Sequence, residues 1–585
     1  MSQSQELTEK LINPPLDGGF FYANRSSCIR ARMDKGKAMR HTLKTILTAS
    51  AAISLLAGCS GGGSSSNSTT VTPPSSTVPN FVANQYPASS SLKSICATVR
   101  TDTDLDGNPR GDQQGELLHE LFWIRSWMDE TYLYYDQVTD RDPNGFTDRG
   151  AYFDERLTTA TTATGNLVDR FSFIQSTEDF EANSSGAPTF GYGAEFARLQ
   201  TNTLPRDWRV AFTQDGSNAE TAGFTRGARI LTIDGVDFLN ATSTADIDVI
   251  VEGLFPSAVG DDHVFGVRLP DGTETEITIT SQSIAVNPVN DVRILQNGDE
   301  SVGYIHYHTF SPVTGEAQLL DAFTQLSNAG VDDLILDFRY NGGGLLALAA
   351  QIGYMAAGPI SVNQTFYLQE FNSRSPNTNP VSGGTVQPIP FIPETIGFSV
   401  DAGQALPSLD LPRVFVLTTG QSCSASEGVM NGLLGIGIEV IQIGTRTCGK
   451  ATGQIPVENC GITYVPLHFR GVNAAGFGDF DDGFAPGQMT GSSGPVIAGC
   501  EVNDDFSSPL GDTSEAMISA ALTYASTGSC PAAAVTKQDA NGPLLSKNAN
   551  FSITDPLMEH DRMKSILVQD NLLNLRGISI DSESK

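Results

Sequence analysis

Two short segments carry side chains that could together cleave an acyl bond. Ser424 lies in the segment Ser422 to Glu427, and Lys450 lies in the segment Thr447 to Gln454. A serine hydroxyl becomes an effective nucleophile when a neighbouring base takes its proton, and a lysine that burial keeps neutral can be that base. Each segment also has an ordinary structural interpretation, because Ser424 suits a helix cap and Lys450 suits a surface turn.

A third segment, Leu334 to Leu345, supplies backbone amides that could hold negative charge. Its apolar residues predict a buried strand, which runs into Gly342 to Gly344 and then into a predicted helix over Leu345 to Met355. Amides at the start of a helix can stabilise an oxyanion. The same order of strand, glycines and helix also suits a generic α/β connection or a phosphate cradle, so this segment alone leaves the choice open.

Apolar strands precede both of the segments that carry Ser424 and Lys450. Val414 to Leu417 reads as a buried strand that leads through a turn to a helix running from Ala425 toward Leu434. Ile438 to Ile443 reads as the next strand and ends shortly before Lys450. Alternating strands and helices of this kind predict an α/β core.

The three segments together resemble the motifs of the tail-specific, or C-terminal processing, serine protease family. Asp337 to Gly344 is similar to the family signature D-x-R-x-N-x-G-G. Ser422 to Glu427 is similar to S-x-S-A-S-E, and Gly449 to Gln454 is similar to G-K-x-x-x-Q. Three motifs in the family's order make a specific resemblance, whereas each motif alone is weak.

The resemblance implies a role for each matching residue. Ser424 would be the nucleophile, Lys450 the general base, and Gln454 the residue that orients the lysine. The backbone amides of Gly343 and Ala425 would form the oxyanion hole. The family needs neither a cofactor nor a metal for this chemistry, so we expect none.

Residues 188 to 287 resemble the PDZ domain that the family inserts before its catalytic core. Gly191 to Phe196 is similar to the family's carboxylate-binding loop, and Ala222 to Gly235 is similar to its A-G-x-x-x-G-D-x-I-x-x-I-x-G stretch. The resemblance implies that a substrate's C-terminal tail adds to the domain as a strand. Its carboxylate would be held by the residues Tyr192, Gly193, Ala194, Glu195 and Phe196.

The start of the sequence predicts an exported lipoprotein. Arg40 and Lys44 precede an apolar stretch from Ile46 to Ala57, which suits a signal peptide and is too short for a stable membrane-spanning helix. The stretch ends in a lipobox-like sequence at Cys59, which would be lipidated and anchor the protein in a membrane. Because Ser60 follows instead of aspartate, we expect the outer membrane, with the protein facing the periplasm.

These features together predict a multidomain α/β protein. Its expected parts are an overcalled start plus a lipoprotein signal peptide (1–58), a flexible Ser/Thr/Gly/Pro tether (59–91), a helical N-terminal region (92–187), a PDZ-like β-rich domain (188–287), a catalytic α/β core of sheet and flanking helices (288–500) and a C-terminal helical extension (501–585).

The cysteine content suits an oxidising compartment. Of the eight cysteines, Cys28 would be removed and Cys59 lipidated, which leaves six for up to three disulfides and roughly 15 possible pairings. We expect Cys448 to pair with Cys460, because this bond would close a short hairpin over Gly453 to Gly461. A zinc site is the alternative, but no Cys-x-x-Cys motif or adjacent histidine supports it.

The charge and the motifs narrow the possible functions. With 35 basic and 66 acidic residues, the chain is a poor match for nucleic acid. The first hypothesis is a serine endopeptidase that cleaves extended or unfolded polypeptides through an acyl-enzyme on Ser424. The alternative is a catalytically silent, PDZ-based peptide-binding scaffold at the outer membrane. A third hypothesis, a histidine-dependent serine hydrolase, lacks the G-x-S-x-G motif.

Overall fold

The computed structural model describes residues 77–104, 107–184, 189–200, 204–311, 313–487 and 494–532. By internal contacts the chain divides into Met1–Thr72 and Pro73–Lys585, and the second unit holds every described residue. The predicted signal peptide, the predicted lipidation site at Cys59 and most of the predicted C-terminal extension therefore lie outside the described residues. No helix within those residues has both the length and the apolar composition to cross a bilayer.

The N-terminal region is built around one long helix, α1 (Leu117–Thr131), which begins with a capping box between Glu116 and His119. Its aromatic residues Trp123 and Trp127 stack with ring centroids 4.8 Å apart and bury a core that also contains Tyr464. The smaller elements are β1 (Ile95–Cys96), β2 (Gln113–Gln114), α2 (Arg149–Asp154), β3 (Phe173–Ser176), α3 (Thr177–Ser184) and the 3-10 turns η1 (Ser89–Ser91), η2 (Tyr135–Gln137) and η3 (Pro143–Gly145).

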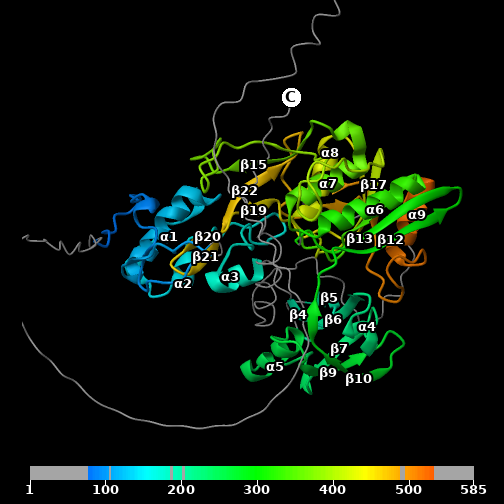
Figure 1. The fold of residues 1–585 in the computed structure, drawn as a ribbon, viewed down its shortest axis with the longest axis horizontal. Coiled ribbons are helices and arrows are strands. Elements are labelled where there is room, and N and C mark those ends of the chain that lie inside the picture. Colours follow the sequence, from blue (N-terminus) through cyan, green and yellow to red (C-terminus); the bar gives the residue numbers. More distant parts are fainter. Residues whose placement is uncertain are drawn as a thin grey trace, which may run out of the picture. The chain divides into compact units, whose positions relative to one another are not determined.

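The β-rich region, from Thr189 to Ile284, consists mainly of strands, as the sequence predicts (Figure 1). Its main sheet has the strand order β10-β9-β7-β6-β5, with β8 paired to β7, and a second small sheet joins β11 to β4. β5 is an edge strand of the main sheet. The elements are β4 (Thr189–Gly191), β5 (Ala194–Gln200), β6 (Asp207–Thr213), α4 (Asn218–Ala222), β7 (Arg229–Ile233), β8 (Val236–Asp237), α5 (Thr244–Leu254), β9 (Asp262–Arg268), β10 (Glu274–Thr280) and β11 (Gln282–Ile284).

The core sheet has the order β12-β13-β14-β17-β18-β25, and every pairing after β12-β13 is parallel. The carboxyl ends of β14, β17 and β18 therefore meet at one edge of the sheet. The strands are β12 (Val289–Asn297), β13 (Glu300–Tyr307), β14 (Asp333–Asp337), β17 (Arg413–Thr418), β18 (Glu439–Gly444) and β25 (Gly499–Glu501).

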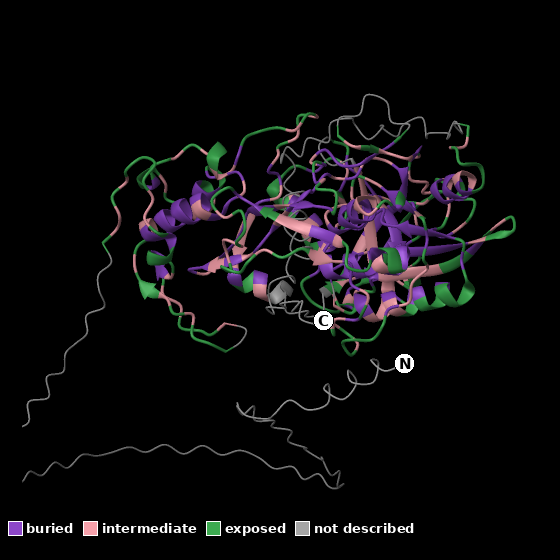
Figure 2. Cartoon of the chain, turned by 90° about the horizontal axis from the view of Figure 1, so that it is seen from above, coloured by how far each residue is buried: buried purple, intermediate pink, exposed green. Residues whose placement is uncertain are grey.

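Helices cover both faces of the core sheet, so its central strands are continuous apolar runs. Side chains alternate along each strand: Leu336 joins the core under α6, α7 and α8, whereas Ile335 joins the core under α9. The central strands β13, β14, β17 and β18 consist largely of buried residues, which Figure 2 draws in purple. The helices are α6 (Gly315–Ala329), α7 (Leu346–Ala357), α8 (Ala425–Gly435) and α9 (Ala516–Thr527).

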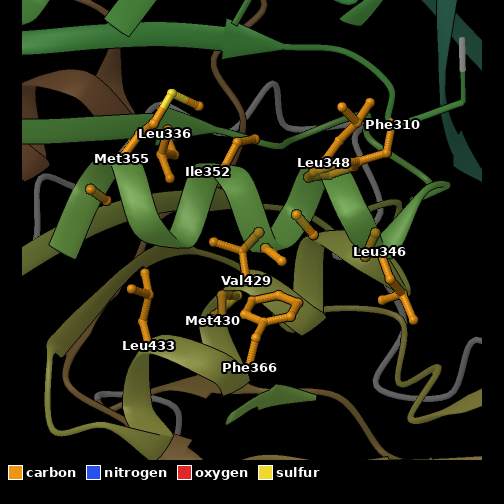
Figure 3. Close-up of a cluster of buried hydrophobic side chains, with 14 of the residues drawn as sticks. Phe310, Leu336, Leu346, Leu348, Ile352, Met355, Phe366, Val429, Met430 and Leu433 are labelled. Atoms are coloured by element: carbon orange, nitrogen blue, oxygen red, sulfur yellow. The ribbon is translucent and has the colours of Figure 1, made fainter. Parts of the chain in front are cut away.

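Close packing of α7 against α8 fixes the helix that starts at Ser424. On the neighbouring side of α8, Gly432 lets the ring of Phe366 lie directly against the helix, because a Cβ there would lie 2.5 Å from the ring. Figure 3 shows the apolar side chains that fill the space between the two helices and the sheet, among them Leu346, Leu348, Ile352, Met355, Phe366, Val429, Met430 and Leu433.

A second sheet, in the order β16-β15-β22-β19, brings the segment after Lys450 to the same part of the core. Its strands are β15 (Thr365–Phe371), β16 (Ile389–Pro390), β19 (Thr452–Gln454) and β22 (Leu467–Val472), and η4 (Gly358–Ser361) precedes β15. The hairpin of β20 (Val457–Asn459) and β21 (Ile462–Val465) pairs with β3, and β23 (Ala485–Pro486) pairs with β24 (Val496–Ile497). These elements confirm the predicted multidomain α/β fold.

The predicted pairing of Cys448 with Cys460 is wrong. Cys448 is bonded to Cys423, and Cys460 is bonded to Cys96 in the N-terminal region. The expected hairpin is shifted, because β19 pairs with β22, and Cys460 lies at the turn between β20 and β21. That turn faces β1, whereas the amide of Cys448 donates to the carbonyl of Ser422 at 3.1 Å. The third disulfide joins Cys500 to Cys530.

Candidate active site

Ser424 lies at the carboxyl end of β17, immediately before α8. Its φ of 55° is in the left-handed region, which costs free energy for a residue with a side chain. Hydrogen bonds on both sides hold this conformation. The amide of Cys423 donates to the carbonyl of Asn341 at 3.0 Å, and the amide of Gly428 donates to the carbonyl of Ser424 at 2.7 Å. A strained, well-held serine at the start of a helix is typical of a nucleophile.

Glu427 joins the serine loop to the lysine loop. It is fully buried, and its Oε2 accepts the amides of Ser424 at 3.0 Å and of Lys450 at 2.9 Å. Its Oε1 accepts the amide of Gly449 at 2.8 Å and the hydroxyl of Thr447 at 2.6 Å. Burial raises the pKa of Glu427 above its ordinary value, and these hydrogen bonds oppose the shift. One carboxylate thus positions both predicted catalytic residues.

Lys450 is 3% exposed and lines one pocket together with Ser424. Its Nζ lies over the ring of Phe171, 5.5 Å from the ring centroid. The bond between Cys423 and Cys448 joins the residue before the serine to a residue two positions before the lysine. The structure therefore ties the two loops together at the carboxylate of Glu427 and again at this disulfide.

Gln454 lines the same pocket, and its side-chain orientation is fixed. Its Nε2 donates to the carbonyl of Phe171 at 2.7 Å and to the carbonyl of Val465 at 2.9 Å. Its Oε1 is buried and accepts no hydrogen bond within the described residues. This oxygen is the atom through which Gln454 could orient the amine of Lys450.

Both predicted oxyanion donors, the amides of Gly343 and Ala425, lie beside Ser424. The amide of Gly343 already has a hydrogen-bond partner. A Cβ on Gly343 would lie 2.7 Å from the Cβ of Ser424 and 3.0 Å from the amide nitrogen of Ala425, so only glycine fits. The amide of Gly343 donates to Oδ1 of Asn341 at 2.9 Å. Gly344, which the sequence analysis did not assign to the site, lines the pocket next to Ser424.

The rest of the pocket wall is largely apolar. Apart from Ser424, Lys450 and Gln454, the lining consists of Gly344, Leu346, Tyr367, Thr452, Gly453, Phe469 and Phe480. Gly453 lets a strand pass directly under an aromatic ring, because a Cβ there would lie 2.2 Å from the ring of Phe469. The pocket thus combines a serine, a lysine and an amide with a largely apolar wall.

The residues predicted to bind a carboxylate lie at the start of β5, away from the lining of this pocket. Tyr192 is buried, and its hydroxyl donates to the carbonyl of Gly253 at 2.7 Å. Gly193 has a φ of 77° and packs against Ser217. Oε2 of Glu195 lies 3.8 Å from Nε2 of His308, the residue that follows β13. Ala194 and Phe196 are partly buried and pack against the core of the β-rich region.

A cluster of buried charges lies on the loop that follows β14. Arg339 is fully buried and binds Asp337 with its Nη2 at 2.6 Å. Its Nη1 donates to Asp504 at 2.8 Å and to Glu515 at 2.9 Å. Arg226 of the β-rich region also binds Asp504, at 2.5 Å. This cluster links the strand before the glycine loop to α9 and to the β-rich region.

Several residues of the site escaped the sequence analysis. Glu427 reads as a helix cap, although an acidic residue in a helix otherwise lined with apolar and small residues is a signal that it has buried partners. Asn341 and Thr447 had no assigned role. Arg170 and Phe171 lie more than 250 residues before the lysine loop, and no local pattern connects them to it. Within the described part of the chain, no group of three His, Cys, Asp or Glu side chains is placed to hold a metal.

The model of peptidase family S41 matches residues 301–464, and the model of the peptidase S41 N-terminal domain matches residues 122–173. A carboxyl-terminal-processing protease of Picosynechococcus sp. is 35% identical over 157 residues, which are 26% of this chain and 36% of that protein. A chloroplastic C-terminal processing peptidase of Tetradesmus obliquus is 33% identical over 160 residues, which are 26% of this chain and 33% of that protein. The matches thus span about a third of these relatives.

A solved structure, a putative S41 protease from Bacteroides fragilis, is similar in fold. It superposes with a TM-score of 0.52 and is 24% identical in sequence. The match covers 70% of this chain and 97% of the other.

Proposed function

We propose that this chain is a serine endopeptidase of the C-terminal processing type, because residues 301–464 match the model of peptidase family S41 and a carboxyl-terminal-processing protease is 35% identical over 157 residues. The observation that carries the proposal is the shared carboxylate of Glu427, which binds the backbone amides of both Ser424 and Lys450. Both side chains line one pocket. A serine and a buried lysine held in this way form a nucleophile and its base.

In the proposed reaction, Oγ of Ser424 attacks the carbonyl carbon of the scissile peptide bond. Lys450, in its neutral form, takes the hydroxyl proton and later gives it to the departing amine. The amides of Ala425 and Gly343 stabilise the oxyanion. Use of the Gly343 amide requires that it exchange its bond to Asn341 for a bond to the substrate. A water molecule then hydrolyses the acyl-enzyme, with Lys450 again as the base.

The apolar wall around Ser424 supports a preference for apolar residues next to the cleaved bond. Leu346, Tyr367, Phe469 and Phe480 line the space beside Ser424. An apolar side chain gains free energy on entering such a surface, whereas a charged side chain would lose its hydration there. The proposed substrates are extended or unfolded polypeptides, because the scissile bond must reach a serine that is only partly exposed.

We also propose that the β-rich region is a PDZ-like domain that holds the C-terminal tail of the substrate. β5 is an edge strand, so one side of its backbone can pair with an added strand. The amides of the Tyr192 to Phe196 loop would hold the terminal carboxylate. The tail would dock in one region while the chain is cut in another.

The proposed location is the periplasmic face of the outer membrane, with a lipid on Cys59. This proposal rests on the sequence before residue 60, which lies outside the described residues. Labelling with radioactive palmitate in a bacterial host would test it, because the label should enter the unmodified protein and be absent from Cys59→Ala.

The catalytic proposal is tested by cleavage of an unfolded reporter protein, with a free or an amidated C-terminus. We expect Ser424→Ala to lower kcat by at least about 10⁴-fold and Lys450→Ala by about 10³-fold. The matched control is Lys93→Ala, which replaces an exposed lysine of the N-terminal region and should keep full activity. Slower cleavage of the amidated reporter would support tail recognition.

Full activity of Lys450→Ala would contradict the Ser-Lys assignment. Absence of cleavage by the folded, unmodified protein would favour the alternative, a catalytically silent peptide-binding scaffold. The placement of Ser424, Lys450 and Gln454 around one pocket argues against that alternative.

A further inference from the structure

A short segment of the N-terminal region, Asp169 to Ser172, reaches the catalytic pocket. The carboxylate of Asp169 accepts the amide of Ser172 at 2.9 Å and the hydroxyl of Tyr132, which follows α1, at 2.6 Å. The hydroxyl of Ser172 accepts the amide of Leu467 at 3.1 Å. The Asp169–Ser172 segment is therefore fixed both to the helical N-terminal region and to β22 of the core.

Arg170 holds the loop that carries Lys450 by its carbonyl groups. Its Nη2 donates to the carbonyl of Cys448 at 2.7 Å and to that of Gly449 at 3.2 Å. The same nitrogen donates to the carbonyl of Asp481 at 3.0 Å. Glu427 binds the amides of this loop, so a carboxylate and a guanidinium together fix the two peptide groups before Lys450.

Phe171 contacts both Gln454 and the amine of Lys450. Its carbonyl accepts Nε2 of Gln454, which fixes the glutamine whose Oε1 has no hydrogen bond within the described residues. Its ring lies under Nζ of Lys450, at 5.5 Å. The face of an aromatic ring attracts an ammonium group more than a neutral amine. The ring therefore stays in contact with the amine when Lys450 takes the proton of Ser424.

We propose that Arg170 and Phe171 are positioning residues for the general base, supplied to the catalytic core by the N-terminal region. Arg170 fixes the backbone that leads to Lys450, while Phe171 fixes Gln454 and contacts the amine of Lys450. The inference rests on the proposed function, because it assigns these residues to the lysine of the proposed reaction. It makes the N-terminal region a part of the active site.

The test compares kcat, KM and the melting temperature of four variants of the full chain with those of the unmodified protein. The reporter is one unfolded peptide with a free C-terminus. Phe171→Leu keeps an apolar side chain and the backbone carbonyl but removes the ring, whereas Phe171→Tyr keeps the ring face. Arg170→Lys keeps the charge but cannot reach three carbonyl groups with the same geometry.

The matched control is Arg125→Lys. Arg125 is also a buried arginine of the N-terminal region, and it also donates to backbone carbonyls, those of Gln85 at 2.9 Å and Val82 at 3.0 Å. None of these residues lines the catalytic pocket. Arg125→Lys therefore reports what the loss of a buried arginine does to stability alone.

We expect Phe171→Leu to lower kcat about tenfold, with KM within about twofold, and Phe171→Tyr to restore kcat. Arg170→Lys should lower kcat about 30-fold, because small displacements of a catalytic group are costly. Arg125→Lys should lower the melting temperature and leave kcat unchanged.

Two results would overturn the inference while leaving the proposed function intact. The first is that Phe171→Leu, Phe171→Tyr and the unmodified protein all have the same kcat. The other is an Arg170→Lys variant that behaves like Arg125→Lys, with lower stability and an unchanged kcat. If Arg170→Lys does not fold, the comparison of the two Phe171 variants decides. If the unmodified protein does not cleave the reporter, the proposed function fails, and the inference fails with it.

Discussion

Two buried carboxylates near the carboxyl edge of the core sheet are stabilised in opposite ways. Glu427, beside the pocket, accepts hydrogen bonds from three backbone amides and one hydroxyl, and none of these donors is a charged group. Asp337, at the end of β14, accepts three hydrogen bonds from the guanidinium of Arg339. Both acidic residues are fully buried.

The pKa values of Asp337 and Glu427 are shifted in opposite directions, in keeping with this difference. Burial acts to raise the pKa of Asp337, but the charge of Arg339 outweighs it and lowers the pKa to about 2. Burial raises the pKa of Glu427, and its neutral donors do not reverse the shift. A cation in contact therefore does more for a buried carboxylate than several dipoles do.

The comparison suggests why neutral donors surround the carboxylate that lies next to the base. The donors to Glu427 are backbone amides of the two loops that carry Ser424 and Lys450, together with the hydroxyl of Thr447. Glu427 therefore fixes the backbone of both loops directly. The ion cluster of Arg339 instead joins parts of the molecule that need rigidity but carry no proton transfer.

Among the variants that test this comparison of two carboxylates, Glu427→Gln is expected to have the largest effect. An amide side chain offers one acceptor oxygen in place of two, so amides of the serine and lysine loops lose their partners and the loops shift. We expect kcat to fall about 100-fold. The matched control is Glu316→Gln, a buried glutamate whose oxygens accept the amides of Ile396 at 2.6 Å and Phe398 at 2.7 Å, far from the pocket lining.

Glu316→Gln should lose stability but keep its kcat. Steady-state kinetics and thermal melting of the two variants give the answer. An equal fall in kcat in both variants would mean that Glu427 acts only through stability.

A smaller effect is expected when the bond between Cys423 and Cys448 is removed by two Cys→Ser substitutions. The same loops remain joined by Glu427, so we expect kcat to fall only about threefold. Removal of a disulfide that closes such a loop should lower the free energy of unfolding by about 3 kcal/mol.

The Cys500–Cys530 pair is the control, because its sequence separation of 30 is close to the 25 of the first pair. Replacing it should destabilise the protein by a similar amount and leave kcat unchanged. Steady-state kinetics would measure kcat, and urea unfolding would measure the free energy of unfolding. A fall in kcat as large as that of Glu427→Gln would show that the disulfide is the main link between the loops.

The disulfides also illustrate what sequence could and could not predict. Continuous apolar strands such as Leu334 to Leu336 predicted the buried sheet, because a strand covered on both faces needs no polar residues. Cysteine pairing depends on which loops meet, and the placement of Cys448 against Ser422 follows from the packing of β17 beside β18. The contact of Arg170 with Cys448 spans 278 positions, so no local pattern could reveal it.

The smallest effect on activity is expected from Asp337→Asn, whose main effect is on stability. The pKa of Asp337 is about 2 in the folded protein and 3.8 in its ordinary state. The ionised carboxylate therefore stabilises the fold above about pH 4, and this contribution disappears as the pH falls from 4 to 2. Asp337→Asn should cost about 2 kcal/mol at pH 7 and change kcat by less than about twofold.

Urea unfolding at several pH values would test this prediction. The difference in unfolding free energy between Asp337→Asn and the unmodified protein should shrink as the pH approaches 2. A difference that stays constant with pH would mean that the charge of Asp337 is not what stabilises the cluster.

The most direct test of the account is to locate the acyl group. The protein is mixed with an unfolded peptide substrate, quenched in acid within the first turnover, and mapped by mass spectrometry. We predict an acyl group on Ser424 in the unmodified protein and none on that residue in Lys450→Ala over the same time. An acyl group on another residue, or equally fast acylation of Ser424 in Lys450→Ala, would contradict the Ser-Lys mechanism.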